Sequence, residues 1–101
     1  MEKNIKESLE KFLGYNIDGV VDYNLLLPIV RKINTLGKEY QFSIFKNYVS
    51  CTVEKSVKFR KDFSFSYAEY ITNEQSDLEA IFKLIVKFVN WYEENNDKNF
   101  V

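Results

Sequence analysis

The sequence predicts an α+β domain in which a three-stranded antiparallel meander is covered by helices. Three observations predict it: a helical spacing of apolar residues before residue 37, a two-residue alternation between about 40 and 68, and a capped helical pattern after residue 76. The element order is α-α-β-β-β-α, and consecutive strands pair most simply as a meander. A length of 101 residues fits one domain spanning 1–101.

The first helix is predicted from an apolar stripe at i, i+4, i+7 and i+8. The stripe consists of Ile5, Leu9, Phe12 and Leu13. We expect Asn4 to cap its start and Gly14 to end it. The following Asp18-Gly19 pair fits either a tight hairpin or a simple turn, because the flanking apolar pairs are short.

A second helix is predicted from Asp22, a good N-cap, to about Leu36, before Gly37. Pro28 lies deep for a first-turn proline, since its missing N–H removes one helical hydrogen bond. We therefore expect an irregular opening turn or a start nearer Leu25.

The strands follow from the change to a period of two. A two-residue turn at Lys46-Asn47 makes register and burial agree, because it places three apolar pairs on one face. These pairs are Ile44 with Val49, Phe42 with Cys51, and Tyr40 with Val53. In the third strand the expected inward residues are Phe63, Phe65 and Tyr67, and the outward ones Ser64, Ser66 and Ala68.

The last helix begins at a capping box in which Ser76 and Glu79 each serve the other's backbone N–H. It should end near Glu94, and residues 95–101 form a polar tail that we expect to fray.

Two stretches resemble small phage- and prophage-encoded proteins of the phage ABA-sandwich domain group. Residues 24–33 (NLLLPIVRKI) resemble the leucine-proline-valine helix of that group, and residues 79–92 (EAIFKLIVKFVNWY) are similar to its terminal helix with a closing Trp-Tyr. The resemblance implies α/β/α layering and a mobile-element origin. It implies no activity and carries over no functional residues.

The strand pattern itself favours a different layering. Apolar and polar residues alternate along the strands, which is typical of a sheet with one face exposed to solvent. We therefore expect the helices mainly on one face, with the N-terminal helix as the best candidate to cover the other.

Composition and charge restrict the function classes. The formal net charge of −1 does not direct the whole molecule to nucleic acid or to an anionic membrane. The single cysteine, Cys51, excludes an intrachain disulfide and agrees with a reducing compartment. No signal-peptide pattern or membrane-length apolar run is present in the sequence, so we expect a cytoplasmic protein.

The sequence offers no recognisable catalytic set. It has no histidine, no glycine-rich phosphate loop and only one thiol, and Cys51 falls on the inward face of a predicted strand. We expect no enzyme activity, no cofactor, no metal and no small-molecule substrate.

Two surfaces are candidates for binding. On one flank of the last helix lie Leu84, Phe88 and Trp91, which could anchor a protein partner or a second copy unless the N-terminal helix packs there. The alternative is a basic and aromatic segment that could bind nucleic acid, or form only a solvated connection. Its residues are Lys55, Lys58, Phe59, Arg60 and Lys61.

From the resemblance and the apolar flank, we expect a non-enzymatic phage or mobile-element accessory protein that binds a macromolecular partner. Inhibition of a host nuclease defence, of CRISPR type or another, is the natural example. The alternatives are a nucleic-acid-binding domain and a homo-oligomeric structural module.

Overall fold

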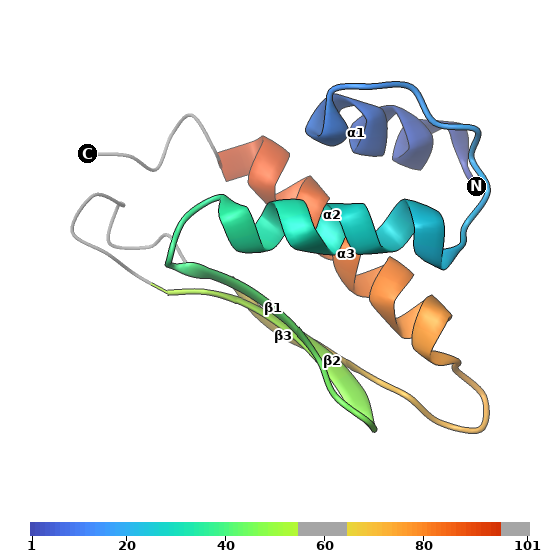
Figure 1. Ribbon diagram of the computed structural model, residues 1–101, viewed down its shortest axis with the longest axis vertical. Helices are drawn as coiled ribbons and strands as arrows, with labels where there is room; N and C mark the ends of the chain where they lie inside the picture. The colour runs from blue at the N-terminus through green and yellow to red at the C-terminus, as the bar shows by residue number, and fades with distance from the viewer. Residues whose placement is uncertain (55–64, 96–101) are drawn as a thin grey trace.

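The computed structural model describes residues 1–54 and 65–95 and confirms the α+β class and the element order (Figure 1). The helices are α1 (Lys3–Leu13), α2 (Tyr23–Thr35) and α3 (Asp77–Asn95). The strands are β1 (Tyr40–Ile44), β2 (Tyr48–Val53) and β3 (Phe65–Tyr70). They form one antiparallel sheet in the order β1-β2-β3. Of the tail predicted to fray, 95–101, Asn95 is the last residue of α3, and residues 96–101 lie outside the described residues.

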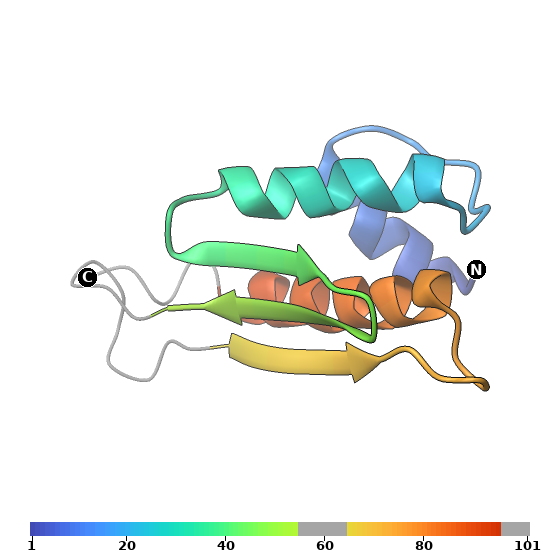
Figure 2. The same cartoon turned by 60° about the horizontal axis from the view of Figure 1, so that its bottom comes forward.

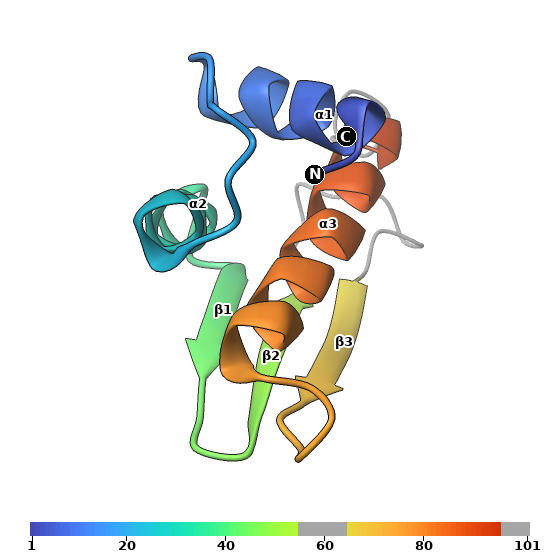
Figure 3. The same cartoon turned by 90° about the vertical axis from the view of Figure 1, so that its right-hand side faces the viewer.

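All three described helices lie on the same side of the sheet. Helix α2 packs on β1, α3 packs on β2 and β3, and α1 packs on α3. Figure 3 shows α1 above α3, and Figure 2 looks onto the second face of the sheet, called here the uncovered face because none of the described helices lies on it. The prediction that α1 covers this second face is therefore wrong. The ring of Phe12 contacts those of Phe88 and Tyr92, so the apolar stripe of α1 is buried against α3.

The α/β/α layering implied by the phage resemblance is likewise not seen in the described residues, since the second sheet face carries no helix there. This agrees with the alternation of apolar and polar residues in the strands.

The hairpin of β1 and β2 has the predicted register. Tyr40 pairs with Val53, Phe42 with Cys51, and Ile44 with Val49. The N–H of Phe45 donates to the carbonyl of Tyr48 at 2.9 Å and closes the turn at Lys46-Asn47. The burial predicted with this register holds except at Ile44, which lies beside the turn and is 46% exposed.

Third-strand burial differs from the prediction at Tyr67. Phe65 is buried as expected, but Tyr67 is 52% exposed although it lies on the helix side of the sheet. Both residues lie on an edge strand, and α3 covers Phe65 but leaves Tyr67 exposed at the side of the sheet. Phe63 and Ser64 lie outside the described residues.

Helix α2 begins at Tyr23 and passes through Pro28, so the expected irregular start is wrong. Asp22 caps it by accepting a hydrogen bond from the N–H of Leu25 at 2.9 Å. A proline in a helix interior costs about 3 kcal/mol, whereas each fully buried large aliphatic side chain contributes about 1.5–3 kcal/mol. The helix buries four such side chains, which outweigh the proline: Leu26, Ile29, Val30 and Ile33.

The ends of the other two helices are partly as predicted. Helix α1 begins at Lys3 with Glu2 as its N-cap, not Asn4, and ends at Leu13 with Gly14 as its C-cap at a φ of 86°. At the start of α3, the hydroxyl of Ser76 accepts from the N–H of Glu79 at 3.2 Å. The carboxylate of Glu79 accepts from the Ser76 hydroxyl at 3.3 Å, in place of the predicted bond to the Ser76 backbone.

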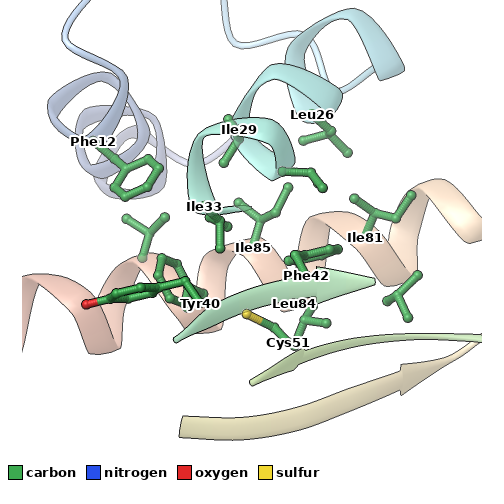
Figure 4. Close-up of a cluster of buried hydrophobic side chains, with 14 of the residues drawn as sticks. Phe12, Leu26, Ile29, Ile33, Tyr40, Phe42, Cys51, Ile81, Leu84 and Ile85 are labelled. Atoms are coloured by element: carbon green, nitrogen blue, oxygen red, sulfur yellow. The ribbon is translucent and has the colours of Figure 1, made fainter. Parts of the chain in front are cut away.

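The core lies between the sheet and the layer of α2 and α3 (Figure 4). Helix α3 supplies its centre, because six of its residues are buried: Ala80, Ile81, Leu84, Ile85, Phe88 and Val89. Cys51 faces this core from β2 and is fully buried.

Candidate binding groove beside the third strand

The predicted partner surface on α3 is mostly inside the molecule. Leu84 and Phe88 are both 0% exposed, so they cannot form a docking surface in the folded chain. The ring of Phe88 meets Phe12 of α1 at 6.0 Å and Phe65 of β3 at 5.6 Å. The alternative was that the N-terminal helix packs on this flank, and Phe12 of α1 does contact Phe88 there. The cover comes from β3 as well as from the N-terminal helix.

Trp91 is different, because it is only partly buried and lines a groove between α3 and β3. The groove has a volume of about 290 Å³. Its lining residues are Phe65, Tyr67, Lys87, Asn90, Trp91 and Glu94. The ring of Phe65 lies between the other two aromatic lining residues, 5.1 Å from the Trp91 ring and 4.9 Å from the Tyr67 ring.

Charged and polar groups stand around these aromatic rings. The ammonium of Lys87 lies 5.0 Å from the centre of the Tyr67 ring and 3.9 Å from the carboxylate of Glu69. Asn90 and Glu94 line the groove from α3 and are exposed. The groove therefore suits a side chain with an apolar body and a polar end.

The backbone at the edge of β3 adds a second feature. The N–H of Ile71, just after β3, donates to the carbonyl of Asn47 at 2.9 Å, so the main-chain groups of Ile71 point toward β2. In agreement, the N–H of Glu54, just after β2, donates to the carbonyl of Glu39 beside β1 at 2.9 Å, so the residue before it, Val53, points toward β3. Because hydrogen-bonding direction alternates along an antiparallel strand, the N–H and C=O of Ser66, Ala68 and Tyr70 point away from β2.

The two edges of the sheet differ. On β1, the side chain of Asn34 bonds both main-chain groups of Phe42. On β3, the carbonyl of Tyr70 accepts from the Gln75 amide at 2.8 Å. Among the described residues, no bond occupies the outward groups of Ser66 and Ala68.

The uncovered face of the sheet is uncharged over the three described strands. The residues directed to it by the alternation are Gln41, Ser43, Phe45, Tyr48, Ser50, Thr52, Ser66, Ala68 and Tyr70. Phe45 stacks on Tyr48 at 4.7 Å, and Tyr48 lies 6.1 Å from Tyr70. This face could contact apolar or hydroxyl-bearing groups, but it supplies no cation for a phosphate.

The single thiol, that of Cys51, is buried and is not accessible as a nucleophile. Burial raises the pKa of Cys51 to about 12, so the thiolate is negligible at neutral pH. Among residues 1–54 and 65–95, no three Cys, Asp or Glu side chains cluster closely enough to hold a metal ion. Within the same ranges, none of the helices has the length and apolar character to cross a membrane.

The predicted nucleic-acid segment falls within residues 55–64, outside the described residues, so its role stays a prediction. Sequence reasoning found Trp91 but missed Tyr67, Lys87, Asn90 and Glu94. The spacing of Lys87, Asn90, Trp91 and Glu94 at i, i+3, i+4 and i+7 is the available signal, since it places them on one helix face.

Fold and groove together define a small α+β domain with an aromatic groove at a strand edge and one sheet face that no described helix covers. No protein-family model, curated protein or solved structure matches the chain. The likeness of two helices to phage ABA-sandwich proteins therefore remains a prediction from the sequence.

Proposed function

We propose that the chain is a non-enzymatic binding domain for a protein partner and that the groove beside β3 is its binding site. The observation that carries this proposal is Trp91, a partly exposed tryptophan whose ring contacts the Phe65 ring in a groove with polar borders. Tryptophan in such a setting is typical of a binding hot spot.

Binding is favoured over catalysis by the chemistry of the available groups. The groove holds no thiol, and histidine is absent from the whole sequence. Its ionisable residues are Tyr67, Lys87 and Glu94, all solvent-exposed, and Lys87 is engaged with Glu69. Such groups hold a ligand by stacking, hydrogen bonding and charge.

The size of the open sheet face argues against face-to-face association of two copies. Three strands of five or six residues cover an area at most about 20 Å long and 14 Å wide. A stable interface buries roughly 800 Å² on each partner. The face alone is too small, so a short segment of another protein fits better than a large flat contact. A phage or mobile-element accessory protein that blocks a host nuclease is one setting in which such a domain would act.

The test uses Trp91 as a reporter, because it is the only tryptophan in the chain. Peptides selected from a displayed library of random short sequences are titrated into the protein while tryptophan emission is recorded. We expect a saturable change in emission. Single-stranded DNA oligonucleotides at low salt are titrated in parallel as the probe for the nucleic-acid alternative.

Variants connect the signal to the groove. By calorimetry, Trp91→Ala should weaken peptide binding by at least about tenfold. Tyr15→Ala is the matched control, since Tyr15 is an exposed aromatic that does not line the groove. If no peptide moves the emission, or if the oligonucleotide alone does, the proposed function is wrong.

A further inference from the structure

We propose that the ligand of this groove is an extended peptide segment, which adds to the sheet as a fourth strand beside β3 and places one side chain in the groove. This inference rests on the proposed function and names the chemical class of its partner.

The backbone of β3 provides the first part of the argument. The N–H and C=O groups of Ser66 and Ala68 point away from β2, in the spacing with which one strand bonds another, and no described residue bonds them. Only an extended chain offers donors and acceptors with this repeat, and edge strands bind such chains in β-augmentation.

The groove provides the second part. Side chains of an added strand would alternate between the two sheet faces, and those on the helix side would lie beside Tyr67 and below α3. A volume of about 290 Å³ is at the lower limit for a drug-sized ligand, and it suits one aromatic or long aliphatic side chain. Figure 3 shows α3 running over the sheet with β3 at its side.

The other edge of the sheet provides the third part. There Asn34 already bonds the N–H and C=O of Phe42, so the chain itself fills the place of a neighbouring strand. An added strand therefore has β3 as its site and not β1.

Charge favours a peptide without a strong charge of its own. The groove carries the cation of Lys87 and the carboxylate of Glu94, and Lys87 is already paired with Glu69. The described strands place no charged residue on the nearby uncovered face. Among the described residues around the groove, neither a polyanion nor a polycation finds a matching set of charges.

The experiment removes one backbone donor at a time. In a peptide that changes Trp91 emission, each amide is N-methylated in turn and binding is measured by calorimetry on the unmodified protein. We expect methylation to weaken binding by at least about tenfold at alternate positions and to have little effect between them.

Variants of the protein test the same backbone hydrogen bonds by changing β3 instead of the peptide. Ala68→Pro deletes an outward N–H and leaves the bonds between β2 and β3 in place, so peptide affinity should fall by at least about tenfold. Ile44→Pro is the matched control, because the N–H of Ile44 points outward on the opposite edge. Circular dichroism checks that both variants fold, and N-methylation keeps the test valid if one does not.

The outcomes separate the two proposals. Peptides that change Trp91 emission but tolerate every N-methylation would overturn the added strand and leave the groove as a binding site. No binding peptide at all would overturn both. A dimer in sedimentation that Ala68→Pro dissociates would identify a second copy as the occupant and overturn the assignment to a peptide.

Discussion

The side chain of Asn34 in α2 forms two hydrogen bonds with the main chain of Phe42 in β1. The Phe42 N–H donates to Oδ1 at 2.7 Å, and Nδ2 donates to the Phe42 carbonyl at 3.1 Å. An amide side chain carries the same donor and acceptor as a peptide group, so Asn34 takes the place of a residue in a neighbouring strand. This contact attaches α2 to the sheet and blocks that edge.

Replacing Asn34 with alanine should lower the free energy of unfolding by about 2 kcal/mol, because two partly buried backbone groups lose their partners. Urea denaturation measures the loss. The control is Asn24→Ala, an exposed asparagine in the same helix, which should change stability by no more than about 0.5 kcal/mol. Equal effects of the two substitutions would show that the contact with Phe42 contributes nothing.

Lys32 of α2 holds the C-terminal end of α1. Its ammonium donates to the carbonyls of Phe12 and Leu13 and lies 5.1 Å from the centre of the Phe12 ring. Lys32→Met keeps the apolar stem and removes the charge, so we expect a loss of about 1–2 kcal/mol.

The same measurement on Lys83→Met, an exposed lysine of α3, serves as the control. In hydrogen exchange, the amides of α1 should lose more protection in Lys32→Met than those of α3. Uniform loss across both helices would contradict a local role for Lys32.

Phe88 and Trp91 should respond differently to truncation. Phe88→Ala leaves a cavity among the rings of Phe12, Tyr40 and Phe65 and should cost about 3–5 kcal/mol of stability. Trp91→Ala should cost less, since Trp91 is only partly buried, and should mainly reduce peptide affinity. A Phe88→Ala protein of undiminished stability would contradict the position of Phe88 at the core centre.

Stability should fall at alkaline pH because of two buried groups. Burial raises the pKa of Cys51 from 9.0 and that of Tyr40 from 10.0, each to about 12. The unfolded chain therefore releases these protons at lower pH than the folded chain does. This contribution to stability is complete below about pH 9 and is lost as the pH rises toward about 12.

Urea denaturation over this pH range, followed by circular dichroism, tests the prediction. Cys51→Ala should reduce the loss that begins near pH 9 and leave the later part due to Tyr40. A stability that stays constant up to about pH 12 would contradict the burial of both groups.

The features that the sequence predicted correctly depend on neighbours along the chain. The register of β1 and β2 follows from apolar alternation and a short turn, and both are local. The cap at Asp22 and the turn at Gly14 are local as well. The prediction of an irregular helix start at Pro28 is wrong because packing against residues distant in the sequence decides whether a helix tolerates a proline.

The groove could not be predicted because it depends on the sideways position of α3 over the sheet. Alternation places Tyr67 on the helix side of β3, but only the placement of α3 decides that Tyr67 stays exposed while Phe65 is covered. The bonds from Asn34 to Phe42 likewise require the packed arrangement of α2 and β1. The resemblance gave no site, and its implied layering differs from the single helical side seen here.

The position of α1 has a consequence for how the chain opens. This helix rests on α3 and is linked to α2 through Lys32, but it contributes no strand pairing and does not pack on the sheet. Sub-global unfolding should therefore begin with α1, as a cooperative unit separate from the sheet and the other two helices. Its detachment would expose one side of the Phe88 and Tyr92 rings while the strands, and the groove beside β3, remain folded.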